Sequence, residues 1–241
     1  MLEINKIHQG DAFQLLEEIE DNSIDLVLTD PPYGISVTNG EHAYGFNKNG
    51  LHFGDWDVGF DTERWVRAIA NKPKKDTGQI LVFNSFHNIE VVARILEEYG
   101  YNVHPTPLYW LKTNPVPHYP DRLPISATEQ VVWATRGESF TFNRNKYLEF
   151  TSGRYPASSH EAQSQRFHTT QKPMGLWMPL VRVHSNQGDT ILDTFGGSGV
   201  TAVAATRLRR NFIVIEADKK YHKLSNERLE TEKRKSKTLW I

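Results

Sequence analysis

The sequence predicts an α/β fold with a mostly parallel, doubly wound sheet. Three observations predict it: short apolar runs suited to buried strands, helical segments that alternate with them, and a glycine-rich turn between one such strand and the helix after it. With 241 residues, the chain is long enough for one large domain that carries a small insertion. We therefore expect a single domain over residues 1–241.

The predicted strands are short runs rich in Val, Ile, Leu and Phe, at residues 24–28, 80–84, 129–135, 190–195 and 211–216. A turn-forming sequence follows the first run at once, so that turn lies at the carboxyl end of its strand. Capping residues, apolar spacing and helix-ending glycines predict helices near residues 11–20, 61–71, 88–98, 174–185, 199–210 and 219–235. Such alternation is typical of a parallel sheet covered by helices.

Two segments interrupt this alternation. Residues 34–60 are rich in Gly, Asn and His, and a loop of this length in a compact domain is usually functional, so we expect a mobile substrate loop here. Residues 137–170 lack helical periodicity but mix Arg and Lys with Phe and Tyr, which predicts an inserted target-recognition region that contacts phosphates and bases. The alternative for the second segment is a solvated strand region with two different faces.

Composition limits the chemistry. Lys and Arg total 28 against 29 Asp and Glu, so a polyanion partner must meet a local basic patch. The absence of cysteine excludes disulfides, thiolate-bound zinc and mechanisms that use a cysteine nucleophile. The histidines show no metal-ligand spacing beside carboxylates, so we expect no metal. No apolar run approaches the roughly 20 residues of a membrane span, and we expect a cytoplasmic protein that binds no membrane.

A glycine-rich turn, TFGGSG at residues 194–199, follows the strand residues TILD, and the next predicted strand ends at Glu216. Glycines let a backbone turn tightly and approach a ligand, and a carboxylate at the end of the second strand can accept hydrogen bonds from two ribose hydroxyls. This βαβ arrangement predicts a nucleotide-type cofactor. The same glycines satisfy the dinucleotide pattern G-x-G-x-x-A between Gly197 and Ala202, which leaves a NAD-dependent oxidoreductase as an alternative.

The turn Asp30-Pro31-Pro32-Tyr33 suits chemistry on a planar nitrogen whose lone pair is delocalised, such as an exocyclic amine of a base or an amide. The Asp30 carboxylate and the Pro31 carbonyl can accept hydrogen bonds from that amine and stabilise the charge that develops as it attacks. The prolines stiffen the turn, and Tyr33 offers a face on which a base rotated out of a duplex can stack. A plain structural turn is the alternative for this motif.

In their order, these motifs resemble the amino-specific S-adenosylmethionine-dependent DNA methyltransferases of the β arrangement, in which the catalytic motif precedes the cofactor motif. Residues 7–34 resemble that family's opening segment, and its central strands and cofactor half resemble residues 78–85, 108–115, 127–137, 168–173 and 193–221. The resemblance covers nearly the whole chain. It implies a Rossmann-like methyltransferase sheet with a small inserted target-recognition region at about residues 137–170.

The resemblance also implies roles for single residues, in methyl transfer from S-adenosylmethionine to N6 of an adenine flipped out of duplex DNA. It implies catalysis by Asp30, Pro31, Pro32 and Tyr33, and cofactor binding by Asp11, Ala12, Asp30, Lys172, Asp193, Phe195, Gly196, Gly197, Ser198, Gly199 and Glu216. Within that set, Asp193 would support the turn, and Lys172 with Pro173 would close over the methionine end of the cofactor. An Asp at the first catalytic position is more typical of adenine enzymes, and a Ser of N4-cytosine enzymes.

Several alternatives stay open at this point: N4-cytosine DNA methylation, RNA adenine methylation, protein glutamine methylation, and an inactive subunit that binds nucleic acid. Without cysteine, methylation at C5 of cytosine is excluded. We expect double-stranded DNA as the main partner, and a homodimer, because the recognition region is short. A cognate restriction enzyme is left open as a further partner.

Overall fold

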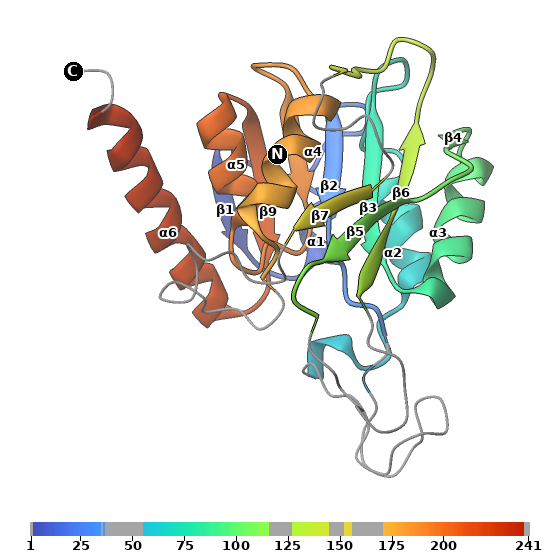
Figure 1. Cartoon of the computed structure of the whole chain (residues 1–241), viewed down its shortest axis with the longest axis horizontal. Coiled ribbons are helices and arrows are strands. Elements are labelled where there is room, and N and C mark those ends of the chain that lie inside the picture. The colour runs from blue at the N-terminus through green and yellow to red at the C-terminus, as the bar shows by residue number, and fades with distance from the viewer. Residues whose placement is uncertain are drawn as a thin grey trace.

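A computed structural model of the protein describes residues 2–34, 36, 55–115, 127–144, 152–155 and 171–238. In this part of the chain, eight strands run through the middle of the molecule in the order β1-β9-β8-β2-β3-β6-β5-β7, and β4 also pairs with β6 (Figure 1). Their bounds are β1 (Lys6–Gln9), β2 (Leu26–Thr29), β3 (Gln79–Asn84), β4 (Asn102–Val103), β5 (Leu108–Lys112), β6 (Thr128–Thr135), β7 (Ser152–Tyr155), β8 (Thr190–Asp193) and β9 (Asn211–Glu216).

The sheet is parallel over five neighbouring strands and mixed beyond them. β1, β9, β8, β2 and β3 are parallel neighbours. β6 runs antiparallel to both β3 and β5, and β7 runs parallel to β5. The carboxyl ends of the five parallel strands therefore meet at one edge of the sheet.

Helices bury both faces of this sheet in two separate hydrophobic cores. One core contains residues of α1 (Ala12–Leu16), α2 (Thr62–Ile69) and α3 (Phe86–Glu98), and the other contains residues of α4 (Met174–His184), α5 (Val200–Leu208) and α6 (Lys219–Thr238). Side chains of β2 alternate between them: Val27 belongs to the first core, whereas Leu26 and Leu28 belong to the second. A strand buried on both faces has no polar side, which explains the continuous apolar runs and the doubly wound α/β class that the sequence predicts.

Some element boundaries differ from the prediction. β1 is missing from the predicted strands, because it lies at an edge of the sheet and Ile7 is its one buried residue. The helix predicted near residues 11–20 ends at Leu16, since the N–H groups of Glu17, Glu18 and Ile19 donate to carbonyls three residues back in tighter turns. The strand predicted at 190–195 ends at Asp193, where the glycine-rich turn begins.

The two interrupting segments are described only in part. Of residues 34–60, the structure describes Gly34, Ser36 and residues 55–60, including the 3-10 helix η2 (Asp55–Asp57). Of residues 137–170, it describes residues 137–144 and β7, which extends the sheet beside β5. The remainder of the predicted substrate loop and recognition region lies outside the described residues.

Candidate active site

Two connections leave the centre of the sheet in opposite directions. β2 leads through α2 to β3, whereas β8 leads through α5 to β9. The chain order therefore reverses between the neighbours β8 and β2, and a doubly wound sheet opens a crevice at the carboxyl ends of its strands at such a point. Asp30 directly follows β2 and Asp193 ends β8, so the two motifs found in the sequence meet at this crevice.

The turn after β8 needs glycine for steric reasons. The Gly196 N–H donates to the Ile215 carbonyl over 2.7 Å, which places the turn against β9. A Cβ on Gly196 would lie 2.5 Å from Cγ1 of Val214, closer than side chains approach. Gly199 has φ +70°, the left-handed region, immediately before α5. Packing against Val214 therefore requires a glycine at 196, and the left-handed backbone favours one at 199, so the turn has no side chain at these two points.

Asp193 ties this turn to the centre of the sheet. It is 2% exposed, and its carboxylate accepts hydrogen bonds from the Thr29 hydroxyl at 2.8 Å, the Thr201 hydroxyl at 2.5 Å and the Phe195 N–H at 3.1 Å. Burial raises the pKa of Asp193 to about 6, although the hydrogen bonds from these three donors lower it. Asp193 thus joins β2, the turn and α5, and its part in a cofactor site stays a prediction.

Glu216 ends β9 at the same edge and is 9% exposed. Its two carboxylate oxygens accept hydrogen bonds from the Gly197 N–H at 2.6 Å and the Asp218 N–H at 2.8 Å. Burial raises the pKa of Glu216 to about 7. A carboxylate offers about four acceptor positions, so two remain for a ligand. These two acceptor positions fit the two donating hydroxyls of a cofactor ribose.

Asp11 and Ala12 lie beside Glu216, because β1 and β9 are parallel with Gln9 opposite Glu216. The Gly10 N–H donates to the Glu216 carbonyl over 3.1 Å. Asp11 caps α1 through its side chain, which accepts from the Gln14 N–H at 3.1 Å. The predicted cofactor residues of β1, β8 and β9 therefore occupy one continuous stretch of the sheet edge.

An aromatic cluster lies next to the glycine-rich turn. The Phe195 ring meets the Phe60 ring edge-on, with 5.4 Å between centroids, and lies 5.6 Å from the Trp65 ring. The Trp65 indole N–H donates to the Thr194 hydroxyl at 3.2 Å, so α2 supports the turn directly. The sequence analysis identified Phe195 but missed Phe60 and Trp65, which reach the turn from distant parts of the chain.

Asp57 and Asn88 shape the turn after β2. One Asp57 oxygen accepts from the N–H groups of Tyr33 at 2.6 Å and Gly34 at 2.9 Å, and the other accepts from the Ser36 N–H at 2.7 Å. The Asn88 side-chain amide donates to the Tyr33 carbonyl at 2.8 Å. A buried acid from η2 and an amide from α3 therefore fix the backbone of the predicted catalytic motif.

The side chains of that motif belong to a chain of charges in which Lys172 is buried and its neighbours are partly buried. The Asp30 carboxylate accepts from the Tyr33 hydroxyl at 2.8 Å through one oxygen and from the Lys172 ammonium at 2.5 Å through the other. The Lys172 ammonium also lies 2.9 Å from Glu129 Oε2, and Lys112 lies 2.8 Å from Glu129 Oε1. The order Asp30, Lys172, Glu129, Lys112 alternates negative and positive charges, so the cluster is neutral as a whole.

Burial and neighbouring charges set the protonation of this cluster. Burial raises the pKa of Asp30, the Lys172 ammonium opposes the rise, and Glu129 adds to it. Burial also favours a raised pKa for Glu129, yet Lys172 and Lys112 outweigh burial and the pKa is lowered. Burial, reinforced by Asp30 and Glu129, raises the pKa of Tyr33 well above its ordinary value, so its hydroxyl keeps its proton and donates.

The Lys172 ammonium lies among three aromatic rings. It lies 5.2 Å from the Phe83 ring centroid, 5.7 Å from that of Trp110 and 6.0 Å from that of Tyr33. Burial would lower the pKa of Lys172, but Asp30 and Glu129 outweigh it and raise the pKa, so the group stays charged. At 6% exposure, this cation depends on its two carboxylates and these rings.

The structure brings the predicted residues together in two groups at one edge: the catalytic turn, and the cofactor turn with Asp11 and Glu216. Lys172 belongs to the catalytic group, and its contact with a cofactor stays a prediction. Sequence reasoning missed Glu129, Lys112 and Asp57, since their partners lie far away along the chain. For Asp57, the acids of the segment GDWD were the available signal.

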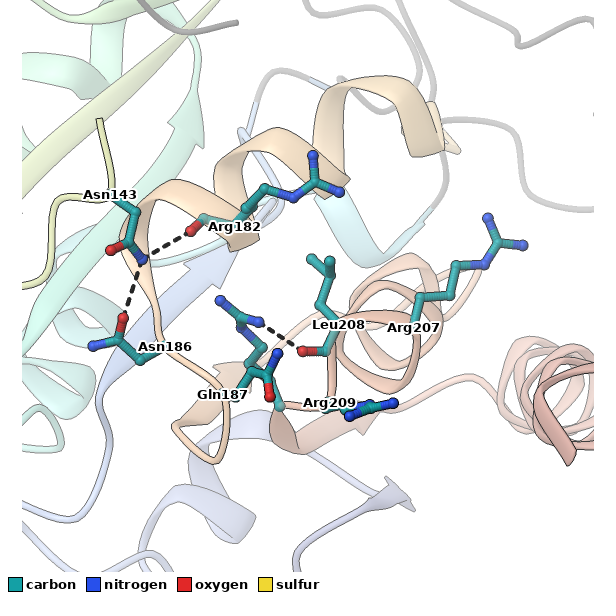
Figure 2. Close-up of a pocket in the computed structure, with 8 residues that line it drawn as sticks. Asn143, Arg182, Asn186, Gln187, Arg207, Leu208 and Arg209 are labelled. Atoms are coloured by element: carbon teal, nitrogen blue, oxygen red, sulfur yellow. Dashed lines mark hydrogen bonds between the residues drawn. The ribbon is translucent and has the colours of Figure 1, made fainter. Parts of the chain in front are cut away.

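A pocket of about 410 Å³ lies at the opposite edge, where residues 186–187 and 207–210 precede β8 and β9. Figure 2 shows Asn143 bridging Asn186 and the Arg182 carbonyl in its wall. Of its arginines, Arg210 donates to the carbonyls of Ser185 and Leu208, and Arg207 pairs with Glu232 at 2.7 Å. These contacts serve the packing of α4, α5 and α6, and the pocket lies away from both motifs.

Two kinds of feature are absent from the described residues: a cluster of metal-binding side chains and a membrane-spanning helix. In the described ranges, no set of three or more His, Asp or Glu side chains is placed to hold a metal ion. No helix in that part of the chain is long and apolar enough to cross a membrane.

Comparison with known proteins gives consistent matches over most of the chain. A family model described as DNA methylase matches residues 24–227. The Type II methyltransferase M2.LlaDCHI of Lactococcus lactis subsp. cremoris is 34% identical over 237 residues, 91% of this chain and 87% of that protein. The crystal structure of the M1.HpyAVI-SAM complex matches with a TM-score of 0.73 at 27% identity, covering 93% of this chain and 99% of that chain.

A more distant structure shares the fold alone. It is the PvuII DNA methyltransferase (cytosine-N4-specific), with a TM-score of 0.70 at 21% identity, covering 91% of this chain and 84% of that chain. The same fold thus occurs in a methyltransferase described as specific for N4 of cytosine, so the fold does not distinguish adenine from cytosine as the target base.

Proposed function

Because this chain belongs to the DNA methylase family, we propose that it transfers a methyl group from S-adenosylmethionine to N6 of an adenine in double-stranded DNA. The observation that carries the proposal is the partly buried Asp30 carboxylate at the reversal point of the sheet, one strand away from the glycine-rich turn. When bound, the cofactor supplies an electrophilic methyl group on a sulfonium centre. The chain's own residues supply position and electrostatics.

The edge formed by β1, β8 and β9 suits the cofactor. Glu216 has acceptor positions for ribose hydroxyls, and the glycines at 196 and 199 leave the turn open to close approach. Asp11 and Phe195 border the same stretch. Together these residues would orient the cofactor so that its methyl group faces the turn after β2.

The turn after β2 suits the amine. In that transfer the amine nitrogen would form its bond to the methyl carbon as the bond from carbon to sulfur breaks, and the proton that the amine gives up would pass to solvent by way of the Asp30 carboxylate. Asp30 and the Pro31 carbonyl accept hydrogen bonds from the amine and stabilise the positive charge that develops on it. Asp57 and Asn88 keep this turn in place.

Adenine is favoured over cytosine by Asp30 itself, since the resembled adenine enzymes more typically have Asp at this position. Buried polar groups nearby are also available to a base. Among the described residues, Asn84 Nδ2, Ser85 Oγ and Gln171 Oε1 are buried without a hydrogen-bond partner. Asn84 ends β3, the strand beside β2, Ser85 follows it, and Gln171 precedes Lys172, so a flipped base at this turn would lie near unsatisfied donors and acceptors.

Exposed aromatic side chains at the same edge support a nucleic-acid partner. Phe86 begins α3 directly after the carboxyl end of β3 and is 78% exposed, and Trp56 of η2 is 47% exposed. Exposed rings of this kind offer stacking surfaces for bases. The predicted contacts of residues 137–170 with DNA remain part of this proposal.

Nucleoside analysis tests the proposal. The protein is incubated with isotopically labelled S-adenosylmethionine and duplex DNA of mixed sequence, and the digested nucleosides are separated by mass spectrometry. We expect label in N6-methyladenine, with none in duplexes that contain only G·C pairs. Label in N4-methylcytosine would overturn the base assignment, and label only in RNA or protein substrates would overturn DNA as the substrate.

A further inference from the structure

We propose that Glu129 is a positioning residue that draws the Lys172 ammonium away from Asp30 when the target amine enters. The inference rests on the proposed function, because it needs an amine that competes for Asp30. It starts from one fact of geometry: both oxygens of the Asp30 carboxylate already have donors, the Tyr33 hydroxyl on one and the Lys172 ammonium on the other.

Each Asp30 oxygen keeps a further acceptor position, so the amine can bind beside Lys172, and the conflict between the two groups is one of charge. A bond between an ammonium and a carboxylate is charge-assisted and stronger than the bond from a neutral amine. As the amine attacks, it becomes positively charged, and a lysine cation on the same carboxylate would repel that charge. Methyl transfer is therefore favoured when Lys172 moves from Asp30 to another acceptor.

Glu129 supplies the second place for this cation. Its Oε2 already lies 2.9 Å from Lys172 Nζ, so the ammonium can leave Asp30 without becoming a buried unpaired charge. The other oxygen, Oε1, is 2.8 Å from Lys112, which keeps Glu129 ionised and in position. The rings of Phe83 and Trp110 lie beside the ammonium and favour a cation throughout a short movement.

The charged groups around Asp30 determine what a change at Glu129 would do. They are Lys172 before α4, Glu129 on β6, Tyr33 of the turn itself and Asp193 at the end of β8, with Lys112 of β5 acting through Glu129. Replacing Glu129 by Gln removes a negative neighbour of Asp30 and leaves Lys172 with Asp30 as its one carboxylate among these groups. Lys172 would then bind Asp30 more tightly.

The test is the single-turnover rate of methyl transfer at saturating cofactor and DNA. For Glu129→Gln we expect the rate to fall by about tenfold or more, the loss that follows when a charge-assisted contact is not released. The pH below which the rate falls should become lower, because the pKa of Asp30 decreases when Asp30 loses a negative neighbour and keeps Lys172 as its cation. For Lys172→Gln this pH should become higher, because the cation is lost.

The double variant Glu129→Gln/Lys172→Gln gives the sharpest outcome. Well above the pH at which the rate falls, it should react faster than Glu129→Gln alone, since there is no longer a lysine to lock Asp30. A purely structural role for Glu129 would give additive losses instead, and that result would overturn the inference. If Glu129→Gln fails to fold, Glu129→Asp replaces it, with a smaller rate loss that removal of Lys172 again relieves.

Glu230→Gln is the matched control, because Glu230 pairs with Lys233 at 3.0 Å on the exposed side of α6. Its rate and pH profile should equal those of the unaltered protein. If the unaltered protein methylates adenine and Glu129→Gln is equally fast, the inference alone fails. If the unaltered protein modifies no base, the proposed function fails first.

Discussion

Glu216 illustrates how one carboxylate can serve both the fold and a ligand. Its oxygens accept the Gly197 N–H of the glycine-rich turn and the Asp218 N–H, and burial raises its pKa to about 7. Because the ordinary value is 4.5, the folded protein near neutral pH contains both the protonated and the charged form. A ligand that donates hydroxyl groups binds the charged form better.

The first prediction follows from the preference of such a ligand for the charged form of Glu216. Cofactor affinity should rise with pH through about 7, because deprotonation supplies the acceptor. Glu216→Ala should weaken binding by about ten- to a hundredfold and remove this pH dependence. Isothermal titration calorimetry with S-adenosylmethionine between about pH 6 and pH 8 measures both effects. An unchanged affinity in Glu216→Ala would show that the ribose is held elsewhere.

Asp193 carries a second prediction, about stability. Asp193→Ala removes an acceptor from three donors, two of them buried hydroxyls of Thr29 and Thr201, and should cost about 1–3 kcal/mol of unfolding free energy. Urea denaturation measures this loss. Asp21→Ala is the control and should change little, because the Asp21 carboxylate is half exposed and its partner Lys72 keeps a hydrogen bond to the Ile19 carbonyl. Equal losses in the two variants would contradict the role given to Asp193.

At the scale of elements, packing between helix and sheet decides the position of both motifs. Trp177 of α4 is 1% exposed, stacks on Phe83 of β3 with 5.1 Å between centroids, and donates to the Thr201 hydroxyl of α5 at 2.8 Å. One side chain thus links α4, α5 and the strand next to Asp30. It also lies close to the start of α4, which Lys172 precedes.

Trp177→Ala should therefore destabilise the protein by about 3–5 kcal/mol, the usual cost of removing a buried tryptophan. Thermal and urea unfolding measure the loss. Trp56→Ala removes the same side chain from a site that is 47% exposed and should lose well under half as much. A similar loss in both variants would mean that α4 does not depend on this contact.

The elements also show how far sequence reasoning reaches. The sequence predicts four strands that are buried on both faces, because such strands form continuous apolar runs: β2, β3, β8 and β9. It also predicts the glycine-rich turn, because packing at 196 and the left-handed backbone at 199 call for glycine. The sequence does not predict β1, since one buried residue among four forms no apolar run. Glu129 was not visible either, because its partner Lys172 lies far along the chain and meets it through tertiary packing alone.

At the scale of the whole molecule, one sheet runs between the two sets of helices (Figure 1). Both motifs lie at the carboxyl ends of its parallel strands, while the pocket at the amino ends belongs to packing. The recognition region predicted at residues 137–170 is short and would leave little surface to hold a duplex. We expect two chains to bind DNA together, and light scattering coupled to size-exclusion chromatography should give the mass of a dimer. A monomer both with and without DNA would contradict this expectation.

The most direct measurement for the active site as a whole is the single-turnover methyl transfer rate of Asp30→Ala at a cofactor concentration shown by calorimetry to saturate it. Asp30 lies on the amine side of the crevice, so cofactor binding should stay close to that of the unaltered protein while methyl transfer falls below detection. A near-normal rate in Asp30→Ala would contradict the chemistry assigned to this edge.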